Sequence, residues 1–271
     1  MTDVFVSEGC VRTNYDFQMV PARIPMKDQI LAVDIGATNV KFCHVDEQGE
    51  LLEGVRRRPT PYPCSPERLI ETLDERIEGS ECERVGIGFP GEFSNGRVIR
   101  PGNLSRPGGV TTEVDPDLEA QWQGFDLQEA LRKVTGRDVR IVNDATLAAL
   151  GCIEGHGVEL ILTLGTGLGI ALSIDGTLRT IRDVGAEVFV RGRTYDQTIG
   201  EHSRSLDEDH WGELLVMAVD GFVREFGATT VHLAGGNARR VTPTLFAEAP
   251  YRVVINGNQA SIKGAAKLFY N

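Results

Sequence analysis

The feature that most constrains this chain is a glycine-tipped pattern that occurs twice. The segment 31–46 reads LAVDIGATNVKFCHVD and the segment 160–175 reads LILTLGTGLGIALSID. A gapless superposition places Gly36 on Gly165 and Asp46 on Asp175. Each copy has an apolar run, a turn of small residues and a second apolar run ending at an acidic residue, which predicts strand, tight turn and strand. The repeat therefore predicts two half-molecules, each with a hairpin tip whose backbone N–H groups can bind an anion.

Outside the repeat, helical and extended patterns alternate along the chain. Amphipathic spacing predicts helices over 67–78, 127–134, 145–153, 209–226, 238–247 and 259–270. Apolar runs predict strands over 50–57, 84–89, 138–142, 230–234 and 252–255, with a hairpin turn at 95–96 and a long loop over 101–124. This order predicts an α/β fold of two similar domains. We expect a tail over 1–27, a small domain over 28–137 joined by the C-terminal segment 258–271, and a second domain over 138–257.

Composition argues against several classes of function. The formal charge of the 271 residues is −11 and the sequence pI is near 5.0, whereas nucleic-acid binding needs a basic face. The run Arg56–Arg58 is expected to be a solvated turn, with a polyanion contact as the alternative. No membrane span or secretory signal is visible, and the five cysteines form no Cys-x-x-Cys pair. We therefore expect a cytoplasmic protein without a zinc site.

Residues at and near the two turns indicate phosphate chemistry. Gly165-Thr166-Gly167 leads into a strand and not a helix, so it fits a phosphate-binding hairpin and not a dinucleotide fingerprint. In the first copy, Asp34 ends an apolar strand, where a carboxylate costs free energy unless it has a partner such as a divalent metal with a phosphate. Lys41 lies farther along the same hairpin, as a phosphate ligand or as a surface lysine.

A second carboxylate is the candidate general base. Asp144 follows the strand 138–142 and precedes a helix, which is where ligands bind in α/β sheets. The alternative is that Asp144 caps this helix. Asn143 beside it offers an amide that could hold a hydroxyl group, and Asn103 in the long loop could do the same.

Taken together, several short motifs resemble a known family. They are DIGAT at 34–38, GFPG at 88–91, VNDA at 142–145, LGTGLG at 164–169 and AGGN at 234–237. In order and spacing they resemble the ROK family of sugar kinases, which belongs to the actin-like ATPase superfold. The segments WQGFDL at 122–127 and GRTYD at 192–196 resemble its polyphosphate glucokinase branch.

The resemblance implies a two-domain actin-like ATPase (ribonuclease H-like) fold with an interdomain cleft, and a hexose kinase that uses Mg²⁺ with ATP or polyphosphate. The residues implied in phosphate, nucleotide and metal binding are Asp34 (also the metal ligand), Gly36, Thr38, Lys41, Gly165, Thr166, Gly167, Gly235, Gly236 and Asn237. Those implied in sugar binding are Gly91, Asn103, Asn143, Asp144 and Asp183, with Asp144 taking the proton from the attacking hydroxyl. The resemblance also implies a homodimer, and a small sugar or polyol as partner in place of nucleic acid or membrane.

The sequence departs from the family pattern at the sugar-binding segment. The family has Glu-x-Gly-His or Glu-x-Ala-His, whereas this chain has Asp183-Val184-Gly185-Ala186. Two hydrogen bonds to a hexose, each worth roughly 1 kcal/mol, are therefore lost or rebuilt. Ala37 stands where a glycine is usual, and the zinc-binding cysteines of many members are missing. The alternatives are a kinase of a non-glucose polyol or a non-catalytic sugar or nucleotide sensor; the repressor branch is disfavoured because no helix-turn-helix pattern precedes the first strand.

Overall fold

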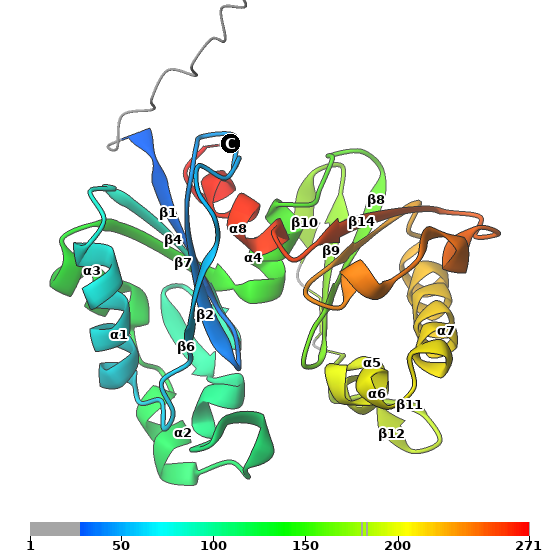
Figure 1. Cartoon of the computed structure of the whole chain (residues 1–271), viewed down its shortest axis with the longest axis horizontal. Helices are drawn as coiled ribbons and strands as arrows, with labels where there is room; N and C mark the ends of the chain where they lie inside the picture. Colours follow the sequence, from blue (N-terminus) through cyan, green and yellow to red (C-terminus); the bar gives the residue numbers. More distant parts are fainter. Residues whose placement is uncertain (1–27, 180, 183, 271) are drawn as a thin grey trace, which may run out of the picture.

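The described part of the molecule contains two five-stranded β-sheets with helices between them and on their outer faces (Figure 1). The computed structural model describes residues 28–179, 181–182 and 184–270. The tail expected over 1–27 and the candidate residue Asp183 lie outside the described residues. Both hairpins of the repeat are present, and their tips point toward the same side of the molecule (Figure 1).

The first sheet is mixed and has the strand order β3-β2-β1-β4-β7. Its strands are β1 (Ile30–Ile35), β2 (Asn39–Val45), β3 (Arg56–Pro59), β4 (Arg84–Phe89) and β7 (Asp138–Asn143). The β1–β2 and β2–β3 pairs are antiparallel, whereas β1–β4 and β4–β7 are parallel. The alternating side chains of β1 therefore face two different helical layers.

The second sheet repeats this topology with the order β10-β9-β8-β13-β14. Its strands are β8 (Val158–Leu164), β9 (Leu168–Ile174), β10 (Thr177–Arg179), β13 (Thr230–Ala234) and β14 (Arg252–Gly257). Again the first two pairs are antiparallel and the last two are parallel. The prediction of two similar half-molecules is confirmed.

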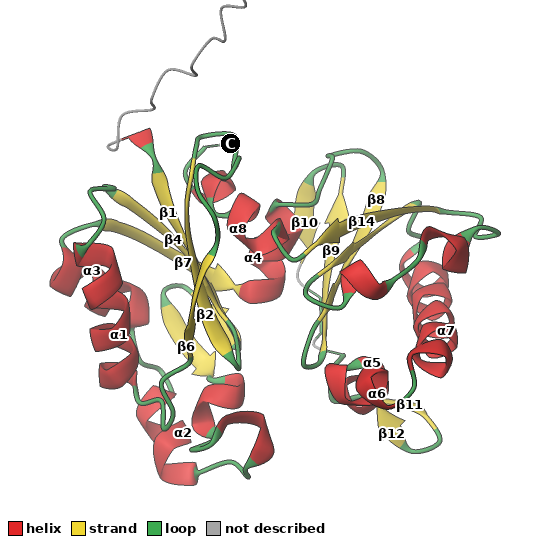
Figure 2. Ribbon diagram, viewed as in Figure 1, coloured by secondary structure: helices red, strands yellow, loops and turns green. Residues whose placement is uncertain are grey.

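Helices divide into an outer set and a central pair (Figure 2). The outer helices are α1 (Pro66–Glu78) and α3 (Leu127–Thr135) on the first sheet and α7 (Glu208–Phe226) on the second. The central pair is α4 (Asp144–Leu150) and α8 (Ala260–Gly264), whose apolar residues pack with β1 and β2. Smaller elements complete the chain: β5 (Glu92–Ser94), β6 (Arg97–Arg100), α2 (Pro116–Trp122), β11 (Val188–Val190), β12 (Arg193–Thr194), α5 (Tyr195–Ile199) and α6 (Glu201–Leu206).

Helix termini follow the local sequence signals. The Ser65 side chain accepts a hydrogen bond from the Arg68 N–H and caps α1, and Pro66 occupies the first turn. Asp126 caps α3, which ends at Gly136 in the left-handed conformation. These boundaries are confirmed because each depends on residues adjacent in sequence.

Three predicted elements differ from the structure. The third strand is Arg56–Pro59 and not 50–57, so the arginine run forms an edge strand where a turn was expected. The segment 101–124 is not a plain loop, because it contains two 3₁₀ turns and α2. The segment 238–247 forms two 3₁₀ turns and not a helix, since Pro243 lacks the N–H that a continuous helix needs.

Two further differences concern the ends of the expected domains. The strand Asp138–Asn143 pairs with β4 in the first sheet, although the expected boundary at residue 138 places it in the second domain. The C-terminal helix is also shorter than the expected 259–270: α8 ends at Gly264 and a 3₁₀ turn, Ala266–Leu268, follows. No helix of the described residues is long and apolar enough to cross a membrane.

Candidate active site

The N-terminus of α4 places Asp144 directly after β7. The preceding residue, Asn143, is the N-cap: its side-chain oxygen accepts hydrogen bonds from the N–H groups of Ala145 (2.9 Å) and Thr146 (3.2 Å). The Asn143 amide donates to the carbonyl of Gly91 at 2.8 Å. The alternative in which Asp144 caps the helix is therefore wrong, and its carboxylate lies in the first turn of α4 with one hydrogen bond, from the Ala145 N–H at 2.8 Å.

The surroundings of Asp144 favour its neutral form. Burial raises the pKa of Asp144 to about 7, and the nearby charge of Asp34 acts in the same direction. The Ala145 N–H and the Lys41 ammonium oppose this change and leave the pKa close to neutrality. A carboxylate with a pKa near 7 is suited to accept a proton at physiological pH.

Glycines from both sheets allow the N-terminus of α4 to approach. A Cβ on Gly88 in β4 would lie 3.3 Å from the Asp144 Cα. A Cβ on Gly169 in β9 would lie 3.3 Å from the Ala145 Cβ and only 2.2 Å from the Thr163 hydroxyl. Gly88 neighbours Asp34 across the β1–β4 pair, so the first turn of α4 lies between the strand beside Asp34 and the second hairpin.

Asp34 is a buried carboxylate with two side-chain partners. It is 6% exposed, and its Oδ2 atom accepts hydrogen bonds from Lys41 Nζ at 2.6 Å and from the Ser261 hydroxyl at 2.7 Å. Lys41 is the cross-strand neighbour of Asp34 in β2, so sheet register explains this pair. Ser261 comes from α8 at the far end of the chain. Ser261 could not be predicted from the sequence, because no local signal links residue 261 to the first hairpin.

The first glycine turn is held by its carbonyl groups. The Thr60 hydroxyl donates to the Gly36 carbonyl and the Tyr62 hydroxyl to the Ala37 carbonyl, each at 2.7 Å. The Gly36 N–H bonds the Asn39 carbonyl within the turn. Among the described residues, the N–H groups of Ala37 and Thr38 have no acceptor. Two successive N–H groups left open at a turn form a site for an anion.

The second turn has a similar arrangement. The Gly165 N–H bonds the Gly167 carbonyl at 3.1 Å, while the Gly165 carbonyl accepts from the Glu201 N–H. In the described part of the chain, no acceptor is found for the N–H groups of Thr166 and Gly167. A Cβ on Gly167 would lie 2.3 Å from a carboxylate oxygen of Asp196, which explains the glycine here.

The turn Gly235–Asn237 packs against the second hairpin. Gly235 has φ +90°, and a Cβ there would lie 2.4 Å from the Leu164 carbonyl oxygen. The Asn237 N–H donates to that same carbonyl at 3.0 Å, and the Asn237 amide donates to the Gly165 carbonyl at 3.2 Å. The structure thus brings Gly235, Asn237 and Gly165 together, and Gly236 is exposed beside them.

The residues expected on the sugar side surround Gly91. A Cβ on Gly102 would lie 2.2 Å from the Pro90 carbonyl oxygen, so the loop that carries Asn103 rests on the segment 90–91. Asn103 is half-buried, and its side chain has no hydrogen bond to another described residue. With Asn143 bonded to Gly91, this brings Gly91 and Asn143 together next to Asp144, with the loop of Asn103 resting against Gly91.

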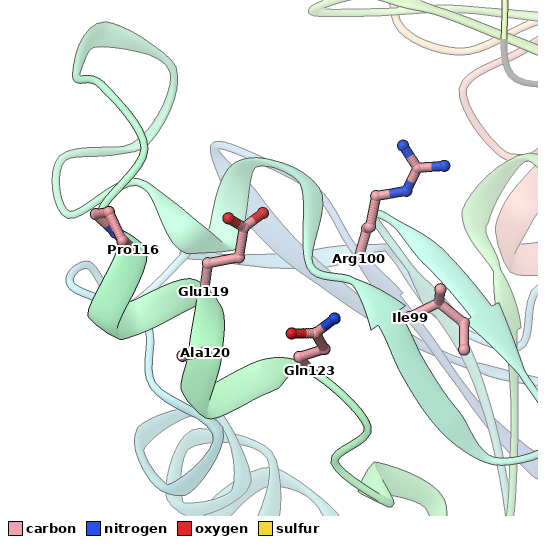
Figure 3. Close-up of a pocket in the computed structure, with 6 residues that line it drawn as sticks. All are labelled: Ile99, Arg100, Pro116, Glu119, Ala120 and Gln123. Atoms are coloured by element: carbon pink, nitrogen blue, oxygen red, sulfur yellow. The ribbon is translucent and has the colours of Figure 1, made fainter.

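Two surface cavities are lined by other residues than these. A cavity of about 300 Å³ is lined by residues of β6 and α2, with Arg100 and Glu119 on its two sides (Figure 3). Another, of about 270 Å³, is lined by Pro243, Phe246, Val253 and Ile255. No group of three or more His, Cys, Asp or Glu side chains that could hold a metal ion occurs among the described residues. The candidate site is defined here by the contacts around Asp144.

Comparison with curated proteins finds several sugar kinases. The chain is 32% identical over 171 residues to a glucokinase of Thermotoga maritima, which covers 60% of this chain and 50% of that protein. It is 23% identical to a polyphosphate glucokinase of Mycobacterium tuberculosis, over 86% of this chain and 88% of that protein. The chain spans about half the length of the glucokinases it matches.

Solved structures agree on the fold. An inorganic polyphosphate/ATP-glucomannokinase from Arthrobacter sp. strain KM has a TM-score of 0.73 and 28% identity, and covers 89% of this chain and 97% of that one. A ROK family glucokinase from Streptomyces griseus has a TM-score of 0.66 and 19% identity, over 89% and 98% of the two chains, a likeness of fold alone. The chain has the two-domain α/β fold of the actin-like ATPases. Because the ROK family model matches residues 30–185, more than half of the 271-residue chain, this protein belongs to the ROK family.

Proposed function

We propose that the protein is a sugar kinase that transfers a phosphoryl group from ATP or polyphosphate to a hydroxyl group of a hexose or related polyol. The observation that carries this proposal is Asp144, a carboxylate with a pKa raised to about 7 in a helix turn that lies between Gly88 of the first sheet and Gly169 of the second hairpin. The similarity to a polyphosphate glucokinase and to a glucomannokinase supports the reaction class.

Each part of the site has a role in this reaction. Asp144 accepts the proton of the attacking hydroxyl, which Asn103 and Gly91 help to position. The open N–H groups at Thr38 and Thr166 hold phosphate oxygens, and Lys41 supplies positive charge near the transferred group. Because phosphoryl transfer needs little covalent chemistry from the protein, positioning and charge stabilisation account for most of the catalysis.

The donor set around Asp34 fits Mg²⁺. Lys41 and Ser261 engage Oδ2 of Asp34, whereas Oδ1 accepts no hydrogen bond from another described residue. Mg²⁺ in kinases is bound by one or two carboxylates together with substrate phosphates and water, so a single free carboxylate oxygen suits it. Asp34 would hold the ion, which supplies neutralisation of the charge on the donor phosphates.

The identity of the acceptor follows from the altered sugar-binding segment. Ala186 stands where the family has histidine, and it is exposed next to the buried Gly185. Loss of an imidazole favours an acceptor without a hydroxyl group to be bound at this point, such as a polyol other than glucose. Homodimer formation remains a prediction from the family resemblance, and a cytoplasmic location remains a prediction from the sequence composition.

A direct assay tests the proposed function. Purified protein is incubated with Mg²⁺, either ATP or polyphosphate, and a panel of hexoses, amino sugars and cyclitols, and phosphorylated product is detected by mass spectrometry. We expect turnover with at least one acceptor. Binding of a sugar by calorimetry without any product would contradict the kinase and favour the sensor alternative.

The pH dependence of the reaction follows from Asp144. The base must be ionised, and its pKa in the folded protein is about 7. We therefore expect kcat/KM to fall about tenfold per pH unit well below pH 7 and to level off above it. Initial rates from pH 5 to 9, with product measured directly, check this. An acidic limb near pH 4 would show that Asp144 ionises as an ordinary carboxylic acid, against its proposed role.

A further inference from the structure

A row of charged residues crosses three strands of the first sheet. Asp34 in β1 is opposite Lys41 in β2, and Lys41 is opposite Arg57 in β3. Directly paired residues on neighbouring strands present their side chains on the same face. The ion pair between Asp34 and Lys41 agrees with this register. Arg57 therefore extends the row from the candidate active site to the edge of the sheet.

The row lies on the face of the first sheet that packs against α4 and α8, and α4 begins with Asp144. Cys43, two residues after Lys41 in β2, packs with Ile262 of α8 and Leu147 of α4. By contrast, Val40 and its neighbours on the opposite face pack with the outer helix α1. Because side chains alternate along a strand, Arg57 faces the central helices and the candidate site, whereas Arg58, which is opposite Val40, faces away.

Arg57 lacks a partner that would balance its charge. It is exposed, and its side chain forms no ion pair or hydrogen bond with another residue in the described part of the chain. The neighbouring Arg56, by contrast, forms an ion pair with Glu53 at 2.5 Å. Lys41, directly opposite, is already paired with Asp34, so Arg57 adds a positive charge that no side chain in the row balances.

The strand that carries Arg57 is tied to the first glycine turn. Three residues after Arg57, Thr60 donates its N–H to the Thr38 carbonyl at 3.0 Å and its hydroxyl to the Gly36 carbonyl at 2.7 Å. At about 3.3 Å per strand residue, Arg57 is on the order of 10 Å from Thr60 along β3. The open N–H groups, Lys41 and Arg57 therefore lie on one continuous surface.

We propose that Arg57 binds a phosphate of a polyphosphate donor beyond the phosphoryl group that is transferred. This inference rests on the proposed kinase function and adds a residue that determines donor specificity. A polyphosphate chain carries negative charge along its whole length, so it gains from a cation at a distance from the reaction centre. ATP ends in a neutral base and a ribose after three phosphates, and gains little from Arg57. An arginine on a phosphate also forms a bidentate hydrogen-bonded pair.

The test compares two neighbouring arginine variants with two donors. In Arg57→Ala, we expect KM for long-chain polyphosphate to rise about tenfold, the amount typical of one lost charged hydrogen bond. KM for ATP and kcat with either donor should change less than about twofold, which is within ordinary variation for an uncoupled site. Arg58→Ala, one residue away on the opposite face, is the matched control and should behave as wild type with both donors. Arg57→Lys should recover part of the affinity for polyphosphate, and its affinity should fall with salt more steeply than that of Arg57→Ala.

The outcomes separate this inference from the proposed function. Three outcomes would each overturn the role of Arg57 and leave the proposed kinase function standing. They are wild-type turnover with ATP alone, equal changes in KM for both donors in Arg57→Ala, and identical behaviour of the two alanine variants. In the last case Arg57 would act only as a charge that protects a sheet edge. No wild-type turnover with either donor would instead contradict the proposed function. Thermal unfolding of each variant shows whether a change in KM has a structural origin.

Discussion

Replacing Asp144 with asparagine is expected to lower kcat by about 1,000-fold and at the same time to make the folded protein more stable above pH 7. The loss of activity follows because an amide cannot accept the proton of the attacking hydroxyl. The gain in stability follows because the folded protein disfavours the ionised carboxylate. The pKa of Asp144 is about 7 when folded, against 3.8 for the free group.

The sign of the stability effect depends on pH. Below pH 3.8 the carboxyl group is protonated in both states and costs nothing. As pH rises from there to about 7, the unfolded chain ionises and the folded one does not, so the wild type loses stability; above pH 7 the loss is complete. It is on the order of 2 kcal/mol and at most about 4 kcal/mol. The amide introduced by Asp144→Asn avoids this cost, while its oxygen can still accept the Ala145 N–H.

Urea unfolding at pH 5 and pH 8, together with initial rates, checks both expectations. The matched control is Asp138→Asn at the opposite end of β7, where the exposed carboxylate pairs with Arg140 at 3.4 Å. That variant should retain its rate and show no pH-dependent gain in stability. A general base contributes more than about a tenfold rate enhancement. If Asp144→Asn keeps more than about a tenth of the wild-type kcat, another group takes the proton.

Replacing Gly264 with alanine is expected to lower the free energy of unfolding by about 3 kcal/mol or more. A Cβ at Gly264 would lie 1.9 Å from the Leu147 carbonyl oxygen, and one at Gly151 would lie 2.0 Å from the Ala260 carbonyl oxygen. These two glycines allow the backbones of α4 and α8 to cross in contact. Since the clashing atoms belong to backbone, relief requires the helices to separate and to disturb the first turn of α4.

Gly221→Ala in α7 is the control with the opposite sign. No atom lies within 4 Å of a Cβ at Gly221, which is inside a 19-residue helix. Alanine there should stabilise the protein by about 0.5–1 kcal/mol through helix propensity. The denaturant midpoints of wild type, Gly264→Ala and Gly221→Ala test both expected changes in stability. A Gly264→Ala variant with a wild-type midpoint would mean that α4 and α8 do not cross as closely as the structure has them.

Elements specified by neighbouring residues could be predicted from the sequence. The two hairpins, the Ser65 cap of α1 and the Gly136 end of α3 all depend on residues within a few positions of one another. The candidate phosphate and base residues were identified in the same way, because glycines in a turn and a carboxylate at the end of a strand are visible locally. Their roles remain proposals.

Elements that depend on a distant partner could not be predicted. The edge strand β3 has no apolar alternation, so only its pairing with β2 places it at Arg56–Pro59. Pairing with β4 likewise assigns β7 to the first sheet. The choice of Asn143 over Asp144 as helix cap was also open, because both side chains can accept the same N–H group.

The sequence alone determined that the chain is a duplicated α/β protein, because hydrophobic periodicity and glycine turns are local features that occur in both copies of the repeat. Only the tertiary structure decided how the site is assembled. It brought the Ser261 hydroxyl into hydrogen-bonding contact with Asp34, which is distant in sequence, and brought Arg57 into the same row as Lys41. Partial burial of the Asp144 carboxylate and the nearby charge of Asp34 raise the pKa of Asp144 to about 7. Burial and charge proximity depend on packing between distant segments, and no local pattern encodes them.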